Sequence, residues 1–543
     1  MAESDLHTDR ELAPSRRAPH GGPWRPLLAL AALIPLAAAV GAIAATPGPE
    51  PTTLARAEAQ SQPGATSLQC PGPLTLPEEL LAEGPDADLA VTPPTETVDL
   101  SSVALEPESS LLFGEVSASE TLQEDDGSVR APDIVTEGSD GTALQDRTAA
   151  QDLGAGVQAV TGIEDSPVVR AATSQGGRPV ADTVQSTATD AGDYRSLSLT
   201  RCAEPTTDAS FLGVSTATGD SSALVLRNPT QRPATASVQV WTEDGPAAME
   251  GRSQVVVAPG AEERVLLESV AGGHDVVGVR TTSLGAPLAM HVQTTERDGL
   301  TPGGAEILQP LAPAAEEQVM PGVEVAGTPP VLVLANPEGA DTTASVDVAG
   351  DDGPVDEAAL EDVEVPAGAV VSVPLESLGD GTFSVSVTSA DPVLAVTRSS
   401  ATGADLPGDT VGSPVDFTLV GSAPAIASHA ITALPAEGAA GELTLAATAD
   451  SAVTVIPIAA DGSAGDPVRT EVSEGGSTSV VAADLEIDGQ SAAGLTVVPE
   501  VPGAVHATWM QRESDGAGGV LLSALPVHTA RSGGDPLTVR LQE

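Results

Sequence analysis

The two cysteines, Cys70 and Cys202, are the residues of this sequence whose type predicts a definite chemistry. Both follow an apolar N-terminal segment, and an even, low cysteine count in an exported chain indicates one disulfide. Closing a loop of about 130 residues would stabilise the folded state by several kcal/mol in the chain-entropy model. The sequence has no CxxC pair, third thiol or neighbouring histidine cluster. It therefore predicts neither a zinc site nor thiol redox catalysis.

No catalytic, cofactor-binding or metal-binding residue is predicted elsewhere. The seven histidines are scattered, and His291 and His506 each lie on the last strand of a repeated unit, where we expect hydrogen-bonded structural residues. The sequence lacks G-x-S-x-G, H-E-x-x-H, P-loop and strand-following G-x-G-x-x-G motifs. Carboxylate pairs occur throughout so acidic a chain, so none of them indicates glycoside hydrolysis. Acidic runs at 351–353 and 361–362 do not follow EF-hand spacing, and we interpret them as solvated turns rather than calcium sites.

Two aromatic residues and three arginines are of types that could contact a ligand. Trp241 and Trp509 sit within alternating strands, which favours packing over sugar stacking. Arg297, Arg398 and Arg512 each follow the final strand of a repeated unit. For these arginines we favour structural ion pairs over anion binding.

The composition excludes one class of partner and limits the cores. The formal net charge is −55, and this balance repels phosphate backbones, so we predict no nucleic-acid binding. Apolar residues make up 41% of the chain but aromatic residues only 1%. Val, Leu and Ala must therefore fill the interior, which predicts several small cores rather than one large core.

An uncharged, apolar run at 27–45 predicts a membrane segment. As a helix it would be roughly 28 Å long, close to the ~30 Å hydrocarbon thickness. Arginines precede it and an acidic stretch follows, so the positive-inside rule places the N-terminus in the cytoplasm and the C-terminal bulk outside the cell membrane. The alternative is a secreted protein, because Ala42-Ile43-Ala44 resembles a signal-peptide cleavage site. The length of the run favours a retained, single-pass anchor.

The only two asparagines, Asn228 and Asn336, both precede proline and lie 108 residues apart. Other segments recur at the same offset: Leu-Val-Leu at 224–226 and 332–334, Asp-Gly-Pro at 244–246 and 352–354, and Leu-Glu-Ser at 267–269 and 375–377. A fixed period is the signature of an internal duplication. A third, diverged copy follows, in which the Asn-Pro pair is lost.

Short strand patterns separated by turn signals predict an all-β fold. Six or seven strands per repeat indicate tandem antiparallel β-sandwich units of immunoglobulin-like kind, with a β-propeller-like fold as the alternative. The predicted order along the chain is a cytoplasmic tail (1–25), a transmembrane helix or signal anchor (26–45), a flexible spacer (46–66), an acidic, partly ordered β-rich region (67–205), three β-sandwich units (206–315, 316–420 and 421–527) and a tail (528–543).

A few short motifs resemble a known family. They are Cys-Pro-Gly-Pro at 70–73, Cys-x-x-Pro at 202–205 and the two Leu-Val-Leu-x-Asn-Pro strands. Together with the N-terminal anchor, they resemble a family of actinobacterial secreted or membrane-anchored proteins known only as a domain of unknown function. The resemblance covers about residues 66–527. It implies location and fold, and supplies no catalytic residue.

The sequence favours a non-enzymatic, membrane-anchored protein of the cell envelope. Its β-repeat domains would interact with an envelope protein or wall polymer. The alternative is an envelope glycan-processing enzyme or accessory that uses carboxylates as acid and base. A cleft with two close carboxylates would favour the enzyme.

Overall fold

A computed structural model describes residues 64–76, 92–118, 120–125, 127–144, 148–173, 178–249, 253–337, 339–405, 412–436 and 440–529. All extended regular elements in these ranges are β-strands, which pair into several antiparallel sheets, and the remainder are short 3-10 turns. The predicted cytoplasmic tail, transmembrane segment and most of the spacer lie outside the described residues. Within the described ranges, no helix is long and apolar enough to cross a membrane.

The strands form four modules that follow one another along the chain. The first contains β1 (Thr66–Gln69), β2 (Val98–Leu105), β3 (Asp133–Glu137), β4 (Ala149–Gln151), β5 (Ala155–Ile163), β6 (Val168–Ala172), β7 (Val180–Thr189) and β8 (Ser196–Arg201). The second contains β9 (Asp208–Val214), β10 (Ser221–Arg227), β11 (Ala234–Thr242), β12 (Gly245–Pro246), β13 (Gln254–Val257), β14 (Glu262–Leu266), β15 (Val277–Leu284), β16 (Ala289–Asp298) and β17 (Thr301–Leu308).

The third module contains β18 (Ala315–Val325), β19 (Val331–Ala335), β20 (Thr342–Gly350), β21 (Gly353–Pro354), β22 (Leu360–Val365), β23 (Val370–Pro374), β24 (Gly381–Thr402) and β25 (Val415–Gly421). The fourth contains β26 (Ala430–Ala433), β27 (Glu442–Ala447), β28 (Ser451–Ile458), β29 (Val468–Val472), β30 (Ser477–Val481), β31 (Gly494–Pro499), β32 (Val505–Ser514) and β33 (Val520–Pro526).

The second and third modules have the same strand order, as the duplication requires. One sheet runs β14-β10-β16-β17 in the second module and β23-β19-β24-β25 in the third. The other runs β12-β11-β15-β9 and β21-β20-β24-β18. The one difference is β24, a 22-residue strand that serves both sheets, whereas the second module has two strands there. The alternation of residues predicts separate strands at 383–387 and 393–397, but the chain continues as one strand between them.

The two asparagines occupy equivalent places. Asn228 Nδ2 donates to the carbonyls of Arg232 and Val257, and Asn336 Nδ2 donates to those of Ala340 and Val365. Every one of these partners is shifted by the same 108 residues. Both asparagines are fully buried, so each fastens the end of its strand to the turn that follows and to the last residue of a neighbouring strand, β13 or β22. This local geometry explains why the Asn-Pro pair recurs.

The first module has the strand order of the fourth except that it lacks a strand in the place of β29, and the sequence does not predict this order for residues 67–205. In the fourth module the sheets run β30-β27-β32-β33 and β26-β31-β28-β29. In the first they run β5-β2-β7-β8 and β1-β6-β3, with β4 added beside β5. Each module has two sheets rather than the single blade that a propeller repeats.

The interior consists of several apolar clusters, as the aliphatic composition predicted. Separate clusters fill the second and third modules, around Phe211 and Val385 respectively. The largest cluster spans the first and fourth modules, joining Leu105 and Val184 to Ile431 and Trp509. The two ends of the described chain therefore share one core and do not pack independently.

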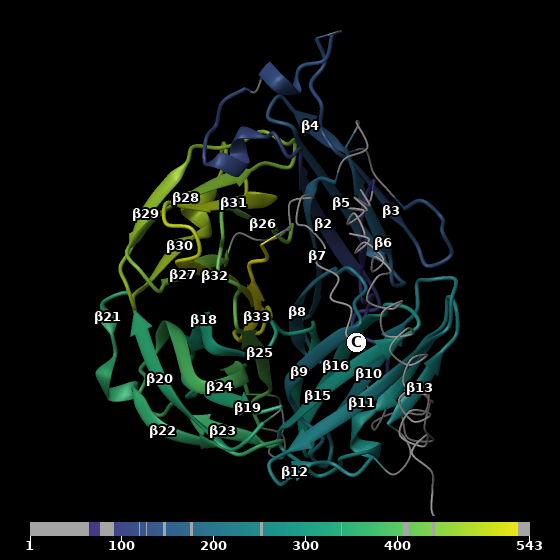
Figure 1. Cartoon of the computed structure of the whole chain (residues 1–543), viewed down its shortest axis with the longest axis vertical. Coiled ribbons are helices and arrows are strands. Elements are labelled where there is room, and N and C mark those ends of the chain that lie inside the picture. Colours follow the sequence, from purple (N-terminus) through teal and green to yellow (C-terminus); the bar gives the residue numbers. More distant parts are fainter. Residues whose placement is uncertain are drawn as a thin grey trace, which may run out of the picture. The chain divides into compact units, whose positions relative to one another are not determined.

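Four edge strands, one from each module, meet at a common centre. These central strands are β8, β17, β25 and β33, and each is the last strand of its sheet. β8 lies against β17 and β33, and β25 lies against the same two strands. Figure 1 labels β8, β25 and β33 close together where the modules meet. The centre is polar, and it holds one of the two candidate sites.

Candidate functional site

The disulfide predicted between Cys70 and Cys202 is confirmed. Cys70 follows β1 in one sheet of the first module, and Cys202 follows β8 in the other sheet. The sulfurs are 1.99 Å apart and the two Cα atoms 4.3 Å apart. Both residues are buried in an apolar cluster with Leu68 and Val98. The bond therefore ties the two sheets together at their edges.

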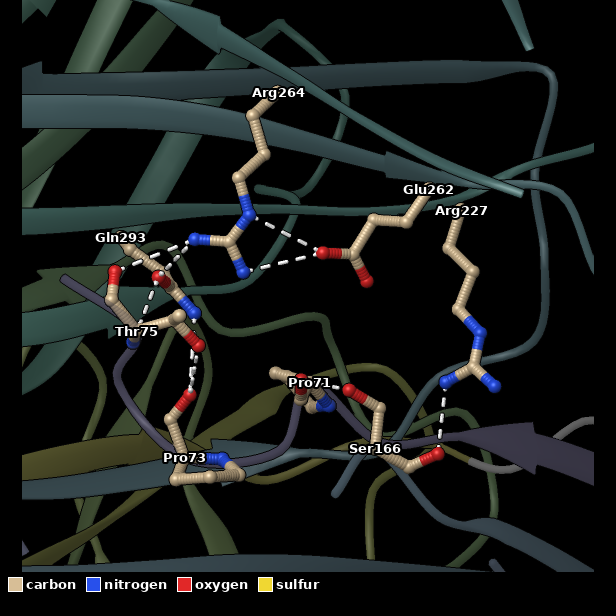
Figure 2. Close-up of polar contacts among 8 residues, drawn as sticks. All are labelled: Pro71, Pro73, Thr75, Ser166, Arg227, Glu262, Arg264 and Gln293. Carbon is tan, nitrogen blue, oxygen red and sulfur yellow. Dashed lines mark hydrogen bonds and ion pairs between the residues drawn. The ribbon is translucent and has the colours of Figure 1, made fainter. Parts of the chain in front are cut away.

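A small pocket lies beside this disulfide, where the first module meets the second. Its wall includes Gln69, Cys70 and Pro71 from the first module and Arg227 and His291 from the second. The peptide after Cys70 is fixed in place, because the Ser166 hydroxyl donates to the Pro71 carbonyl at 2.7 Å. Arg227 Nη1 in turn donates to the Ser166 carbonyl at 2.7 Å, as Figure 2 shows.

Arg264 lies on β14, the strand beside that of Arg227, and its guanidinium makes several hydrogen bonds. Arg264 Nε and Nη2 donate to one oxygen of Glu262 at 3.2 and 3.1 Å, and Nη1 donates to the Thr75 carbonyl at 3.3 Å. Glu262 is the register partner of Arg227 on β14, yet its carboxylate bonds to Arg264. Burial, with the charges of Arg264 and Arg227, lowers the His291 pKa to about 3. The imidazole in the pocket wall is therefore neutral at physiological pH.

The second candidate site is a pair of carboxyl groups among the central strands. Glu306 on β17 is 4% exposed and Asp416 on β25 is fully buried. Glu306 Oε1 accepts hydrogen bonds from the Ser198 hydroxyl at 2.5 Å and from its neighbour, the Ile307 N–H, at 3.0 Å. Ser523 of β33 donates to Oε2 at 3.4 Å. Glu306 thus joins strands from three modules.

Asp416 accepts hydrogen bonds from the edges of two strands at once. Its Oδ2 accepts the N–H of Leu197 on β8 at 3.3 Å and the N–H of Leu522 on β33 at 2.9 Å. Edge strands present unpaired backbone groups that need partners when they are buried. Side chains of neighbouring modules provide them here, including Ser523 Oγ for Leu199 N–H at 2.9 Å.

Both carboxyl groups titrate far above their ordinary range. Burial is the main cause for each; it raises the pKa of Glu306 to about 8, with a further contribution from Asp416. The pKa of Asp416 rises to about 7, although the N–H groups of Leu522 and Leu197 and the charge of Arg195 oppose the rise. Two carboxyls with raised pKa values could donate and accept protons near neutral pH. Three of their four oxygens, however, accept hydrogen bonds from backbone and hydroxyl groups, Asp416 Oδ1 has no hydrogen-bond partner among the described residues, and the cavity beside Glu306 has a volume of only about 10 Å³. A sugar ring has no access to them.

The residues weighed in the sequence analysis are structural in most cases. Trp241 and Trp509 are 4% and 0% exposed, so both pack in the interior. His506 Nδ1 lies 2.7 Å from the Ala423 carbonyl, as expected of a structural histidine. His291 differs from the expectation, because its Nε2 has no hydrogen-bond partner among the described residues.

The three arginines expected to follow the final strand of a unit instead lie within β16, β24 and β32, each of which is followed by one more strand, and all three form ion pairs. Arg297 pairs with Asp193, Arg398 with Glu296, and Arg512 with both Glu324 and Glu442. The preference for structural ion pairs is confirmed. Within the described ranges, no group of three or more His, Cys, Asp or Glu side chains is placed to hold a metal ion.

The sequence profile of a family of unknown function, DUF5719, matches residues 157–483, which is more than half of the chain. The chain belongs to this family. The match runs from β5 of the first module to the region of β30 in the fourth. The matched region of this DUF5719 protein therefore includes Glu306, Asp416 and His291. Cys70 lies outside it. No curated protein matches the chain.

Proposed function

We propose that this DUF5719 protein is a non-enzymatic, membrane-anchored protein of the cell envelope, whose β modules carry binding surfaces for a protein or wall-polymer partner. The observation that most supports this proposal is the role of Glu306 and Asp416 in joining the modules. These buried carboxyls bond to strands of neighbouring modules and are closed off from a substrate-sized molecule. They hold the modules in one fixed arrangement, which suits a scaffold.

The proposed location rests on the N-terminal sequence and the disulfide. A retained helix at 26–45, preceded by arginines, would leave the modules outside the membrane. Disulfides persist in oxidising compartments, so the bond between Cys70 and Cys202 supports an extracytoplasmic site. We also propose that the paired sheets are immunoglobulin-like sandwiches. A cleaved, secreted form is the alternative.

The second module offers a surface for a protein partner. Val256 on β13 and Leu284 on β15 are both register partners of Thr235 on β11, so the three lie in one row across the sheet. Their exposed fractions are 64% for Val256 and 76% for Leu284. Exposed apolar side chains on either side of one residue of an acidic protein favour contact with another protein.

Protease treatment of intact cells tests the proposed topology. If the anchor is retained, protease added outside should digest the modules and leave an N-terminal fragment of about the first 45 residues in the membrane. A tag at residue 1 and a second tag at residue 543 would identify the two ends. Modules that resist protease in intact cells but are digested after lysis would contradict an external location.

A sedimentation assay with isolated envelopes separates a scaffold from an enzyme. The full-length protein in detergent should co-sediment with envelopes and release no soluble glycan. A double Val256→Glu, Leu284→Glu variant should sediment less, and a double Glu306→Gln, Asp416→Asn variant should sediment as the wild type does. Glycan release by the wild type that disappears in the second variant would establish the enzyme alternative.

A further inference from the structure

The pocket beside the disulfide contains buried polar atoms without partners. Gln69 Oε1 and His291 Nε2 both lie in its wall, and neither has a hydrogen-bond partner among the described residues. The two side chains are 8% and 7% exposed. An unpaired buried polar atom costs about 1–3 kcal/mol of stability. A ligand that forms hydrogen bonds with both atoms would therefore bind more tightly. The cavity volume is about 30 Å³, larger than the roughly 10–15 Å³ that one water needs.

The pocket also contains a cation that no carboxylate neutralises directly. Among the described residues, Arg227 forms no ion pair, and its one hydrogen bond is to the carbonyl of Ser166. The other charged groups of the wall are matched. Arg201 pairs with Asp182, Glu204 with Arg178, and Glu262 with Arg264. Arg227 is therefore a cation of the pocket wall that has no carboxylate partner among the described residues.

We propose that this pocket binds the carboxylate end of a small amide-bearing molecule, such as the end of a peptide chain. Arg227 would bind the carboxylate through its remaining N–H groups, which match a planar carboxylate. The neutral imidazole of His291 would donate from Nε2, and Gln69 Oε1 would accept the ligand's amide N–H. Met290 and Pro310 provide apolar wall for a small side chain. Figure 2 shows Arg227 directed at the peptide of Ser166 that borders this pocket.

A carboxylate fits the pocket better than a phosphate. Glu204 and Glu262 also line it, and each would repel a dianion more strongly than a monoanion. A planar group also suits the small volume. The inference goes beyond the scaffold proposal, because the pocket would bind such a ligand whatever partner the outer surfaces engage.

Three small probes test the proposal on the unaltered full-length protein. N-acetylalanine carries the carboxylate and the amide N–H, propionate carries only the carboxylate, and N-acetylalaninamide carries only amides. Calorimetric titration should give N-acetylalanine an affinity about tenfold or more above that of either other probe. Equal affinities for the three probes, or no binding at tens of millimolar, would overturn the proposal. The cavity would then hold only water.

Variants at Arg227, compared with a variant at a distant arginine, locate the binding. Arg227→Met should lower the affinity for N-acetylalanine by about 10- to 100-fold. Arg227→Lys should lower it by less, because lysine keeps the charge but lacks the paired N–H donors of the guanidinium. Arg469→Met is the control, because Arg469 lies on β29 of the fourth module and its side chain is 61% exposed; the affinity of this variant for N-acetylalanine should stay within about twofold of the wild-type value. Equal affinity in wild type and Arg227→Met would place the ligand elsewhere. If Arg227→Met fails to fold, the affinity of the Arg227→Lys variant and the comparison of the three probes still test the proposal.

Discussion

Replacing Glu306 by glutamine should protect the folded protein against alkaline pH. The folded state holds the Glu306 proton up to a pKa of about 8, whereas the ordinary value is 4.5. Between these values the folded state binds more protons than the unfolded state, so stability falls as the pH rises through this window. Glutamine stays neutral. Its Oε1 can still accept from Ser198 and Ile307, and its Nε2 can donate to Ser523 Oγ.

The size of the effect follows from the pKa shift. Each pH unit between 4.5 and 8 removes about 1.4 kcal/mol from the wild-type free energy of unfolding for this one group. Across the window the loss reaches at most about 5 kcal/mol, and the variant should avoid it. Asp416, whose pKa is raised to about 7, adds a similar slope that the variant keeps. Below pH 4 the two proteins should differ by about 1 kcal/mol or less.

Urea unfolding of the full-length chain at pH 4.5, 6, 7.5 and 9 measures these slopes. Tryptophan fluorescence reports the unfolding, because Trp509 is fully buried in the core shared by the first and fourth modules and Trp241 is only 4% exposed. Glu471→Gln is the control, since that side chain is 78% exposed. The variant should be more stable than the wild type at pH 9. If the two curves stay parallel from pH 4.5 to 9, Glu306 ionises freely and the reasoning fails.

Three further predictions concern structural links. Cys202→Ser should cost about 2–5 kcal/mol of stability, and in the wild type thiol labelling should fail without reductant and succeed with it. Asn228→Ala should destabilise the protein by about 1–3 kcal/mol, and Asn336→Ala by less, because Asn228 also accepts two hydrogen bonds through Oδ1, as urea unfolding would show. Arg201→Ala should cost about 3–5 kcal/mol by leaving Asp182 buried and unpaired, and a combined Arg201→Met, Asp182→Leu protein should recover much of the loss in the same assay.

Much of the architecture was predictable because it depends on local patterns. Alternation and turn residues indicated the strands, and the repeated Asn228 and Asn336 fixed the equivalence of two modules. The first module was not recognised, because its equivalence lies in strand order and its sequence has none of the repeated motifs. The Cys70–Cys202 bond was predictable because only two cysteines exist.

The candidate sites depend on contacts between distant segments, which no local pattern contains. Glu306 and Asp416 are two carboxylates among 77 acidic residues, and only the meeting of four strands distinguishes them. His291 was expected to be a satisfied structural residue because its position on a strand predicts burial. The structure shows instead that His291 Nε2 has no hydrogen-bond partner among the described residues and that His291 lines a pocket together with Gln69 of the first module.

The core shared by the first and fourth modules has a consequence for biosynthesis. On β8, the backbone N–H groups of Leu197 and Leu199 find their partners on Asp416 and Ser523, which are made more than 200 residues later. A nascent chain that has completed only its first module therefore presents a bare strand edge and an uncovered apolar face. Such edges pair readily with other chains. Chains shortened before β33 should aggregate or be degraded, so the last strand acts as a test that synthesis is complete.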